Sequence, residues 1–305
     1  MRLFDDATLR TLERLNLWAE SVRVGVMKGD RRSRRRGASI EFADYRDYTQ
    51  GDDLRRLDWN VFARLERPFI KLTEEQEDLA VHLLIDTSAS MDWPPDEGDT
   101  SENKLLYSLR LAGALGTIAL TSGDLVQVTL FDAAAQSNWG PFRGRANGWP
   151  LLQFLEAQFA ARAHAGNTGY ATALDPALRR YAQRARRPGL LFLLSDLFSP
   201  GDVRDGLTAL LARGYEVVLL HVLSPDEAAP ELAGDLRLID VETGEAAEVS
   251  PDPALLEEYA ARLAAWQEGL RRFCGPRGIH YADVVTEQPW DALVRGALRQ
   301  QGVIR

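Results

Sequence analysis

Three oxygen-bearing side chains stand at alternate positions directly after a short apolar run: Asp86, Ser88 and Ser90. The run at 81–85 has a β-branched residue at each end and is typical of a strand buried on both faces of a parallel sheet. Ligands of α/β proteins collect just beyond the carboxyl ends of such strands. A carboxylate and two hydroxyls offer only oxygen, which hard cations such as Mg²⁺ prefer. The pattern therefore indicates a cation site, with an ordinary strand-end turn as the alternative.

Two further oxygen donors follow later elements. Thr168 lies in the loop Gly-Asn-Thr-Gly at 166–169, where Thr172 offers a competing hydroxyl. Asp196 follows a second apolar run at 189–195, just as Asp86 follows the first. Because ligands gather at the carboxyl ends of parallel strands, these donors are expected to serve the same site as Asp86. The alternative for Asp196 is a carboxylate that caps the following helix.

Five residues of this chain together resemble the metal-ion-dependent adhesion site of von Willebrand factor A domains: Asp86, Ser88, Ser90, Thr168 and Asp196. The resemblance implies that the two serines and the threonine contact Mg²⁺, or another divalent cation such as Mn²⁺ or Ca²⁺. It also implies that the aspartates act directly or through water, and that one coordination position stays open for a carboxylate from a protein partner. The loop departs from the family pattern at Asn167, where a second glycine is common.

The stretch upstream of the metal motif carries a second set of motif residues: Arg46, Tyr48, Gly51, Asp52, Arg55, Asp58, Trp59, Ala63 and Arg64. The two motifs together look like the prokaryotic family known as domain-of-unknown-function family fifty-eight. Its members are von Willebrand factor A-like proteins often encoded beside MoxR-type AAA+ ATPases. The resemblance covers most of the chain and implies such an ATPase as a partner. Many relatives begin with membrane-spanning helices, but no such helix is expected in this sequence, so the resemblance does not carry membrane attachment over.

The composition is that of an ordinary globular protein, with 305 residues of which 45% are hydrophobic and 27% charged. A net charge of −9 argues against bulk attraction to nucleic acid or anionic membranes. The single cysteine, Cys274, allows no internal disulfide, and the first residues lack the features of a signal peptide. The apolar window at 105–122 contains Arg110 and several small residues, which favours a buried helix over a membrane span. We therefore expect a cytoplasmic protein with no integral membrane segment.

From residue 79 onward, apolar strands alternate with helices, which predicts an α/β domain with a mostly parallel sheet flanked by helices. Together with the resemblance, this implies a von Willebrand factor A-like, Rossmann-type fold. Parallel strands are predicted at 81–85, 125–131, 189–195, 216–222 and 279–285, and an antiparallel strand at 136–142. Helices are predicted at 104–121, 150–161, 173–184, 203–213, 253–273 and 290–300. A β-hairpin insertion is expected over 236–249.

The first 78 residues are expected to form an N-terminal extension that packs on the main domain at 79–305. Leucine spacing predicts a helix within 3–24. Residues 41–59 alternate aromatic, Arg and Asp side chains too densely for a simple amphipathic element. An edge strand over 62–72 is predicted to lead towards the core. We interpret this extension as structural, with arginines that pair with carboxylates.

The chain lacks a P-loop, a dinucleotide-binding glycine motif and an evident nucleophile–base pair. Asp86 superficially resembles the nucleophile of a haloacid-dehalogenase phosphatase, but that chemistry needs a second Asp where Ser88 stands. We therefore expect a non-enzymatic, metal-dependent protein-interaction module. Two alternatives stay open: a metal-dependent hydrolase, and a nucleic-acid-binding protein that uses the basic run from Arg31 to Arg36. For that run, a solvated loop neutralised by the acidic body is the first interpretation.

Overall fold

A computed structural model describes residues 2–17, 41–49, 57–74, 79–95, 102–132, 136–162, 173–184 and 187–304. The chain divides into two compact units. The larger unit joins Met1–Val24 to Leu79–Arg305, and the smaller unit is Gly25–Asp78.

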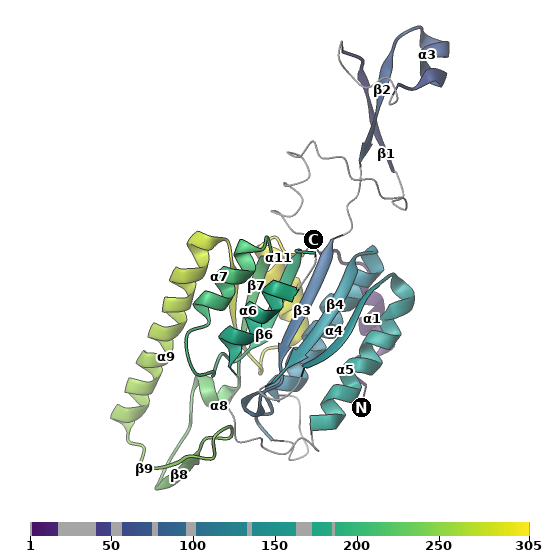
Figure 1. The fold of residues 1–305 in the computed structure, drawn as a ribbon. Coiled ribbons are helices and arrows are strands. Elements are labelled where there is room, and N and C mark those ends of the chain that lie inside the picture. The colour runs from purple at the N-terminus through teal and green to yellow at the C-terminus, as the bar shows by residue number, and fades with distance from the viewer. Residues whose placement is uncertain are drawn as a thin grey trace. The chain divides into compact units, whose positions relative to one another are not determined.

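The larger unit is built on a six-stranded sheet, as far as the described residues show, in the order β10-β7-β6-β3-β4-β5 (Figure 1). Its strands are β3 (Ala80–Asp86), β4 (Leu125–Phe131), β5 (Gln136–Arg143), β6 (Leu190–Ser195), β7 (Glu216–Leu223) and β10 (His280–Val285). All neighbours are parallel except β4 and β5. The predicted mixed α/β class, with a mostly parallel sheet and an antiparallel strand at 136–142, is confirmed.

The chain leaves β3 in one direction through β4 and β5, and returns on the other side of β3 as β6. This reversal is a topological switch point, where the connections that follow two neighbouring strands diverge. In doubly wound sheets such a point opens a crevice at the carboxyl ends of the strands. Asp86 is the last residue of β3 and Asp196 directly follows β6, so both predicted residues lie at this point.

Alternate side chains of the central strands are buried in two separate cores, one on each face of the sheet. In β3, Leu83 and Ile85 belong to one core and Leu84 to the other. In β6, Phe192 lies on the first face and Leu193 on the second. Because both faces are covered, the strands are apolar along their length, which is why the sequence predicted them well.

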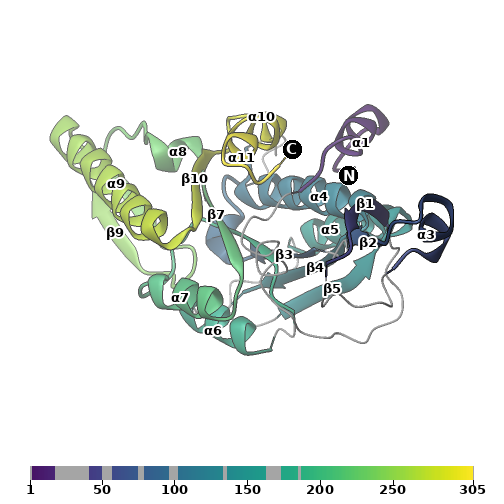
Figure 2. The same cartoon turned by 90° about the horizontal axis from the view of Figure 1, so that it is seen from above.

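Helices cover both faces, as Figure 2 shows from above. One core includes residues of α1 (Asp6–Leu12), α4 (Lys104–Ser122), α5 (Gly148–Arg162), α10 (Trp290–Arg295) and α11 (Ala297–Gln300). The other includes residues of α6 (Leu174–Arg184), α7 (Arg204–Ala212) and α9 (Pro253–Cys274). The predicted helix at 290–300 is divided at Gly296, whose backbone angles, φ −100° and ψ −88°, are not helical.

Helix α4 is the described helix that is long and apolar enough to cross a membrane by length and composition. Most of its residues are buried in the protein core. Asn103 caps its first turn by accepting a hydrogen bond from Leu106 N, and Gly123 ends it in a left-handed conformation. These contacts indicate the central helix of a folded domain, as the sequence predicted.

The N-terminal helix α1 belongs to the larger unit, whereas the sequence assigned it to the extension. Leu3, Phe4 and Leu12 are buried in the same core as α4. Leu17 also forms an isolated antiparallel bridge with Ile304. A helix was predicted within 3–24, and α1 spans Asp6–Leu12 of that range, while residues 18–24 lie outside the described ranges.

In the smaller unit, β1 (Glu41–Asp47) pairs antiparallel with β2 (Phe69–Glu74), and α3 (Trp59–Leu65) lies between them in the chain. The predicted edge strand over 62–72 is therefore wrong in its first half, because Asp58 starts a helix there by accepting a hydrogen bond from Val61 N at 3.2 Å. The strand at Glu41–Asp47 was not predicted, because its dense mixture of charged and aromatic residues shows no clear alternation of polar and apolar side chains. The run from Arg31 to Arg36 lies outside the described residues.

Candidate metal-binding site

The loop after β3 is held at both ends by contacts within the protein itself. Thr87 donates hydrogen bonds from its backbone N and its Oγ1 to Phe131 O, at 2.9 and 3.0 Å. A single 3-10 turn, Ala89–Met91, follows, and the Met91 side chain is fully buried. Ser88 and Ser90 therefore sit on a short, anchored turn at the switch point.

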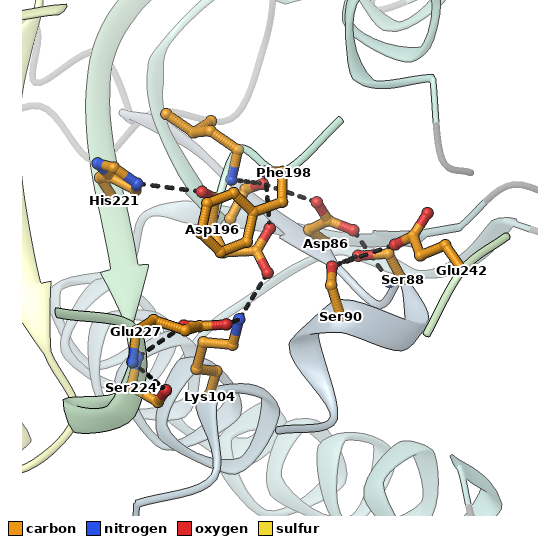
Figure 3. A network of polar contacts seen from close by, with 12 residues as sticks. Asp86, Ser88, Ser90, Lys104, Asp196, Phe198, His221, Ser224, Glu227 and Glu242 are labelled. Carbon is orange, nitrogen blue, oxygen red and sulfur yellow. Dashed lines mark hydrogen bonds and ion pairs between the residues drawn. The ribbon is translucent and has the colours of Figure 1, made fainter. Parts of the chain in front are cut away.

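The two serines lie side by side, with 3.1 Å between their Oγ atoms (Figure 3). Ser90 Oγ also donates a hydrogen bond to Glu242 Oε1 at 3.1 Å. Glu242 belongs to the turn between β8 (Leu236–Ile239) and β9 (Ala246–Val249), the predicted hairpin. Three oxygen atoms from two distant parts of the chain thus meet at this point.

The Asp86 carboxylate beside this pair is fixed by two donors. Ser88 N donates to Oδ1 at 3.0 Å, and Ser195 Oγ donates to Oδ2 at 2.7 Å. Burial and, second, the charge of Asp196 raise the pKa of the Asp86 carboxyl to about 7, against the lowering effect of these hydrogen bonds. In the absence of a cation, the ionised form of Asp86 is therefore disfavoured.

Asp196 lies next to Asp86 but has partners of its own. Lys104 Nζ donates to its Oδ2 at 2.7 Å, and Phe198 N donates to its Oδ1 at 3.0 Å. Its backbone oxygen accepts a hydrogen bond from His221 Nε2 at 3.0 Å. Asp196 is thus held in place from three sides, and both of its carboxylate oxygens already accept a hydrogen bond.

Lys104 is completely buried and holds two carboxylates at once. Besides Asp196, its Nζ contacts Glu227 Oε1 at 2.5 Å. Glu227 is itself fixed by a capping box with Ser224 at the start of α8 (Pro225–Ala228), and burial raises the pKa of its carboxyl. The single positive charge of Lys104 lies between these two carboxylates and does not contact the serine pair by any described hydrogen bond.

The structure brings four of the five predicted residues to one edge of the sheet: Asp86, Ser88, Ser90 and Asp196. The fifth, Thr168, lies outside the described residues, as does its competitor Thr172. Within the described part of the chain, no three His, Cys, Asp or Glu side chains gather around one point. A cation here would therefore depend on hydroxyl oxygens as well as carboxylates.

The serine pair fits a small divalent cation by its spacing. Mg²⁺ takes six oxygen ligands at about 2.0–2.1 Å in octahedral geometry, so neighbouring ligands lie about 3 Å apart. The Oγ atoms of Ser88 and Ser90 are 3.1 Å apart, and both belong to an anchored turn. Asp86 adds a buried carboxylate whose ionised form a cation would favour. Asp196 fits a contact through water better than a direct one, because the positive charge of Lys104 at its Oδ2 repels a second cation nearby.

Sequence reasoning did not identify four residues of this region: Ser195, Lys104, Glu227 and Glu242. Lys104 carried one available signal, a cation in the first turn of an apolar helix, where the helix dipole disfavours positive charge. Ser224 and Glu227 form a capping-box pattern that the sequence shows. For Glu242 no local signal exists, since it meets Ser90 across 152 positions.

The chain matches the family model described as "Protein of unknown function DUF58" over residues 44–269. It is 31% identical to the uncharacterized protein Rv1480 of Mycobacterium tuberculosis over 301 residues, covering 98% of this chain and 90% of that protein. It is also 34% identical to the uncharacterized protein MAV169 of Mycobacterium avium over 150 residues, covering 49% of this chain and 85% of that protein.

Two solved structures show more distant similarity. One is an aerotolerance-related membrane protein from Bacteroides fragilis, with a TM-score of 0.44 and 17% identity, covering 73% of this chain and 98% of that chain. The other is the conserved hypothetical protein BatB from Bacteroides thetaiotaomicron, with a TM-score of 0.41, 15% identity and the same coverage.

Proposed function

The chain belongs to the family described as protein of unknown function DUF58, and we propose that it is a non-enzymatic, metal-dependent protein-interaction module of the von Willebrand factor A type. The observation that carries the proposal is the pair of serine hydroxyls, 3.1 Å apart, beside the buried Asp86 at the switch point of a parallel sheet. This arrangement offers oxygen ligands to a hard cation at the edge where ligands of such folds bind.

Mg²⁺ is the proposed cation, and when bound it supplies a positive centre that attracts an anionic group. Ser88 and Ser90 would hold it directly, together with Thr168, whose place lies outside the described residues. Asp86 would hold it directly or through water, and Asp196 through water. Ser195 and the backbone of Ser88 orient the Asp86 carboxylate for this task. A carboxylate from a protein partner would complete the ligand set.

A MoxR-type AAA+ ATPase is the proposed partner, and assembly or maturation of other proteins is the proposed process. This step rests on the resemblance of the two motifs to proteins encoded beside such ATPases. The proposed location is the cytoplasm, because Cys274, the single cysteine, is a buried free thiol.

Binding is favoured over hydrolysis by the state of the two histidines that are buried in the main sheet, His82 and His221. Both ring nitrogens of His82 form hydrogen bonds, Nδ1 with Tyr181 Oη at 2.7 Å and Nε2 with Arg187 O at 3.0 Å. His221 has the same kind of partners, Tyr281 Oη and Asp196 O. A general base needs a free ring nitrogen that faces the reacting group, and neither histidine offers one.

The test is direct binding of a purified MoxR-type ATPase from the same organism, measured by biolayer interferometry in Mg²⁺ and in EDTA. Wild type should bind the ATPase in Mg²⁺ and not in EDTA. In Mg²⁺, Ser88→Ala should bind it at least tenfold more weakly than wild type does. The matched control is Ser137→Ala on the edge strand β5, which should bind as wild type does. Equal binding in Mg²⁺ and EDTA by all three proteins would contradict the proposal.

A further inference from the structure

Glu242 is a buried carboxylate in an otherwise exposed hairpin. Its exposed fraction is 6%, whereas Ile239 and Val241 in the same hairpin are 61% and 45% exposed. A charged side chain at the tip of a hairpin is expected to stay in water, yet this one is buried while apolar neighbours are exposed. Burial of a carboxylate is costly unless a partner compensates it, so the position of Glu242 requires an explanation.

The turn itself presents Glu242 towards the serine pair. Asp240 Oδ1 accepts hydrogen bonds from Glu242 N at 2.8 Å and from Thr243 N at 3.0 Å. The backbone closes around them, with Gly244 N donating to Asp240 O and Asp240 N donating to Glu245 O, both at 2.8 Å. Because the turn is internally bonded in this way, the direction of the Glu242 side chain is set within the hairpin.

Glu242 continues the row of oxygens that the serines begin. Its Oε1 is 3.1 Å from Ser90 Oγ, which is 3.1 Å from Ser88 Oγ (Figure 3). Both separations are close to the roughly 3 Å expected between neighbouring ligands of an octahedral Mg²⁺. A carboxylate oxygen has more than one lone pair, so accepting the Ser90 proton does not prevent it from binding a cation as well.

We propose that Glu242 is an internal ligand of the metal site, which occupies the position of the partner's carboxylate and closes the site with the β8–β9 hairpin. This inference rests on the proposed function, because it presumes a cation on the serine pair. A tethered carboxylate acts at an effective concentration in the millimolar range or above. A partner's carboxylate must therefore displace Glu242 from the cation. The hairpin thus sets how tightly a partner has to bind in order to compete.

The first experiment measures Mn²⁺ binding by the electron paramagnetic resonance signal of free Mn²⁺. Wild type should bind, and Glu242→Gln, which keeps an oxygen acceptor for Ser90 but loses the charge, should bind at least tenfold more weakly. Glu245→Gln is the matched control, because Glu245 is an exposed residue of the same turn, and it should bind as wild type does. Equal affinity in all three proteins would overturn the role of Glu242.

The second experiment is chemical rescue, which remains informative if the charge change alters the hairpin. Glu242→Ala should bind Mn²⁺ weakly, and millimolar acetate should restore at least half of the lost affinity by filling the position of the carboxylate. Acetate should have no effect on Ser88→Ala. No rescue, together with wild-type affinity in Glu242→Gln, would remove Glu242 from the ligand set.

Hydrogen exchange of the backbone amides supplies a readout that does not depend on affinity. Mg²⁺ should slow exchange of the turn at 240–245 in wild type and Glu245→Gln, and leave it unchanged in Glu242→Gln. Protection in Glu242→Gln equal to that of wild type would show that the hairpin closes without this carboxylate. Absence of Mn²⁺ binding by wild type would overturn the proposed function and this inference together, whereas binding without a Glu242 effect would overturn the inference alone.

Discussion

Ser195 donates its hydroxyl proton to Asp86 Oδ2 over 2.7 Å, and this bond joins the carboxyl ends of the two central strands. Ser195 Oγ in turn accepts a hydrogen bond from Leu197 N at 2.9 Å, so the backbone after β6 fixes its direction. The orientation of Asp86 is therefore determined by the neighbouring strand and not by a ligand. Preorganisation of this kind lowers the cost of binding, because the carboxylate need not be ordered when the ligand arrives.

Replacement of Asp86 by Asn should have opposite effects with and without metal. In EDTA at pH 8, Asp86→Asn should unfold at a higher temperature than wild type, because burial and the charge of Asp196 raise the pKa of the Asp86 carboxyl and thus disfavour its ionised form. In Mg²⁺ at 100 times its dissociation constant, wild type should gain about 2.7 kcal/mol and the variant little. Thermal unfolding in both buffers measures this, and equal Mg²⁺ shifts in the two proteins would remove Asp86 from the site.

Replacement of His82 by Gln should reduce the acid sensitivity of folding. Burial lowers the pKa of His82 to about 4, below its ordinary value of 6.5. Because the folded pKa is depressed, the contribution of His82 to stability is fully present above pH 6.5 and is lost as pH falls towards 4. Between pH 7 and pH 5, wild type should therefore lose about 1–2 kcal/mol more than His82→Gln.

Urea unfolding at the two pH values measures the difference. Gln can still donate a hydrogen bond to Arg187 O in place of His82 Nε2, so most of the local packing is kept. His221 also has a pKa lowered to about 4 by burial, but it is present in both proteins and cancels from the comparison. An identical pH dependence in wild type and variant would show that His82 titrates normally in the folded state.

Replacement of Lys104 by Met should destabilise the protein strongly, by about 3–5 kcal/mol, because it leaves the buried Asp196 without its cation. Replacement of Glu227 by Gln should cost less, since Glu227 is 19% exposed and retains water. Combining the two changes should recover part of the loss by removing one of the two negative charges that Lys104 holds. The free energy of unfolding in urea checks this order, and additive losses in the double variant would contradict it.

Replacement of Gly189 by Ala should destabilise the sheet by about 1–3 kcal/mol, whereas Gly148→Ala should be neutral or slightly stabilising. A Cβ on Gly189 would overlap the backbone oxygen of Ala80 at the start of β3, and backbone cannot move aside as a flexible side chain can. A Cβ on Gly148, at the start of α5, meets nothing within 4 Å. Equal melting temperatures for the two variants would contradict the close approach of the strands.

The sequence predicted the strands that are buried on both faces, because their side chains are apolar without interruption. The position of Asp86 followed from the abrupt end of one such run, and that of Asp196 from the end of another. The short α3 was missed because its helical signal is the cap at Asp58, which was hidden among neighbouring charges. The apolar residues of α3 are also largely exposed, so they do not form the buried stripe at helical spacing that usually identifies a helix in a sequence.

The contacts of Glu242 and Lys104 could not be predicted, since each depends on where distant segments meet. Lys104 reaches Asp196 across 92 positions and Glu227 across 123. A lysine in sequence is ordinarily a solvated surface residue, and only the folded arrangement of α4, β6 and α8 makes it a buried one. Local patterns thus located the ends of the strands, while the charges around them required the tertiary structure.

The matching hydrogen bonds of the two buried histidines, His82 and His221, provide a spectroscopic probe and an internal reference in one molecule. A carbonyl oxygen can only accept, so His221 carries its proton on Nε2, facing Asp196 O, and His82 does so facing Arg187 O. The imidazole nitrogens of both should show the chemical shifts of the same neutral tautomer. A cation that moves Asp196 should shift the resonance of His221 Nε2 and leave that of His82 Nε2 in place. Nuclear magnetic resonance of the ¹⁵N-labelled protein can therefore follow occupancy of the site.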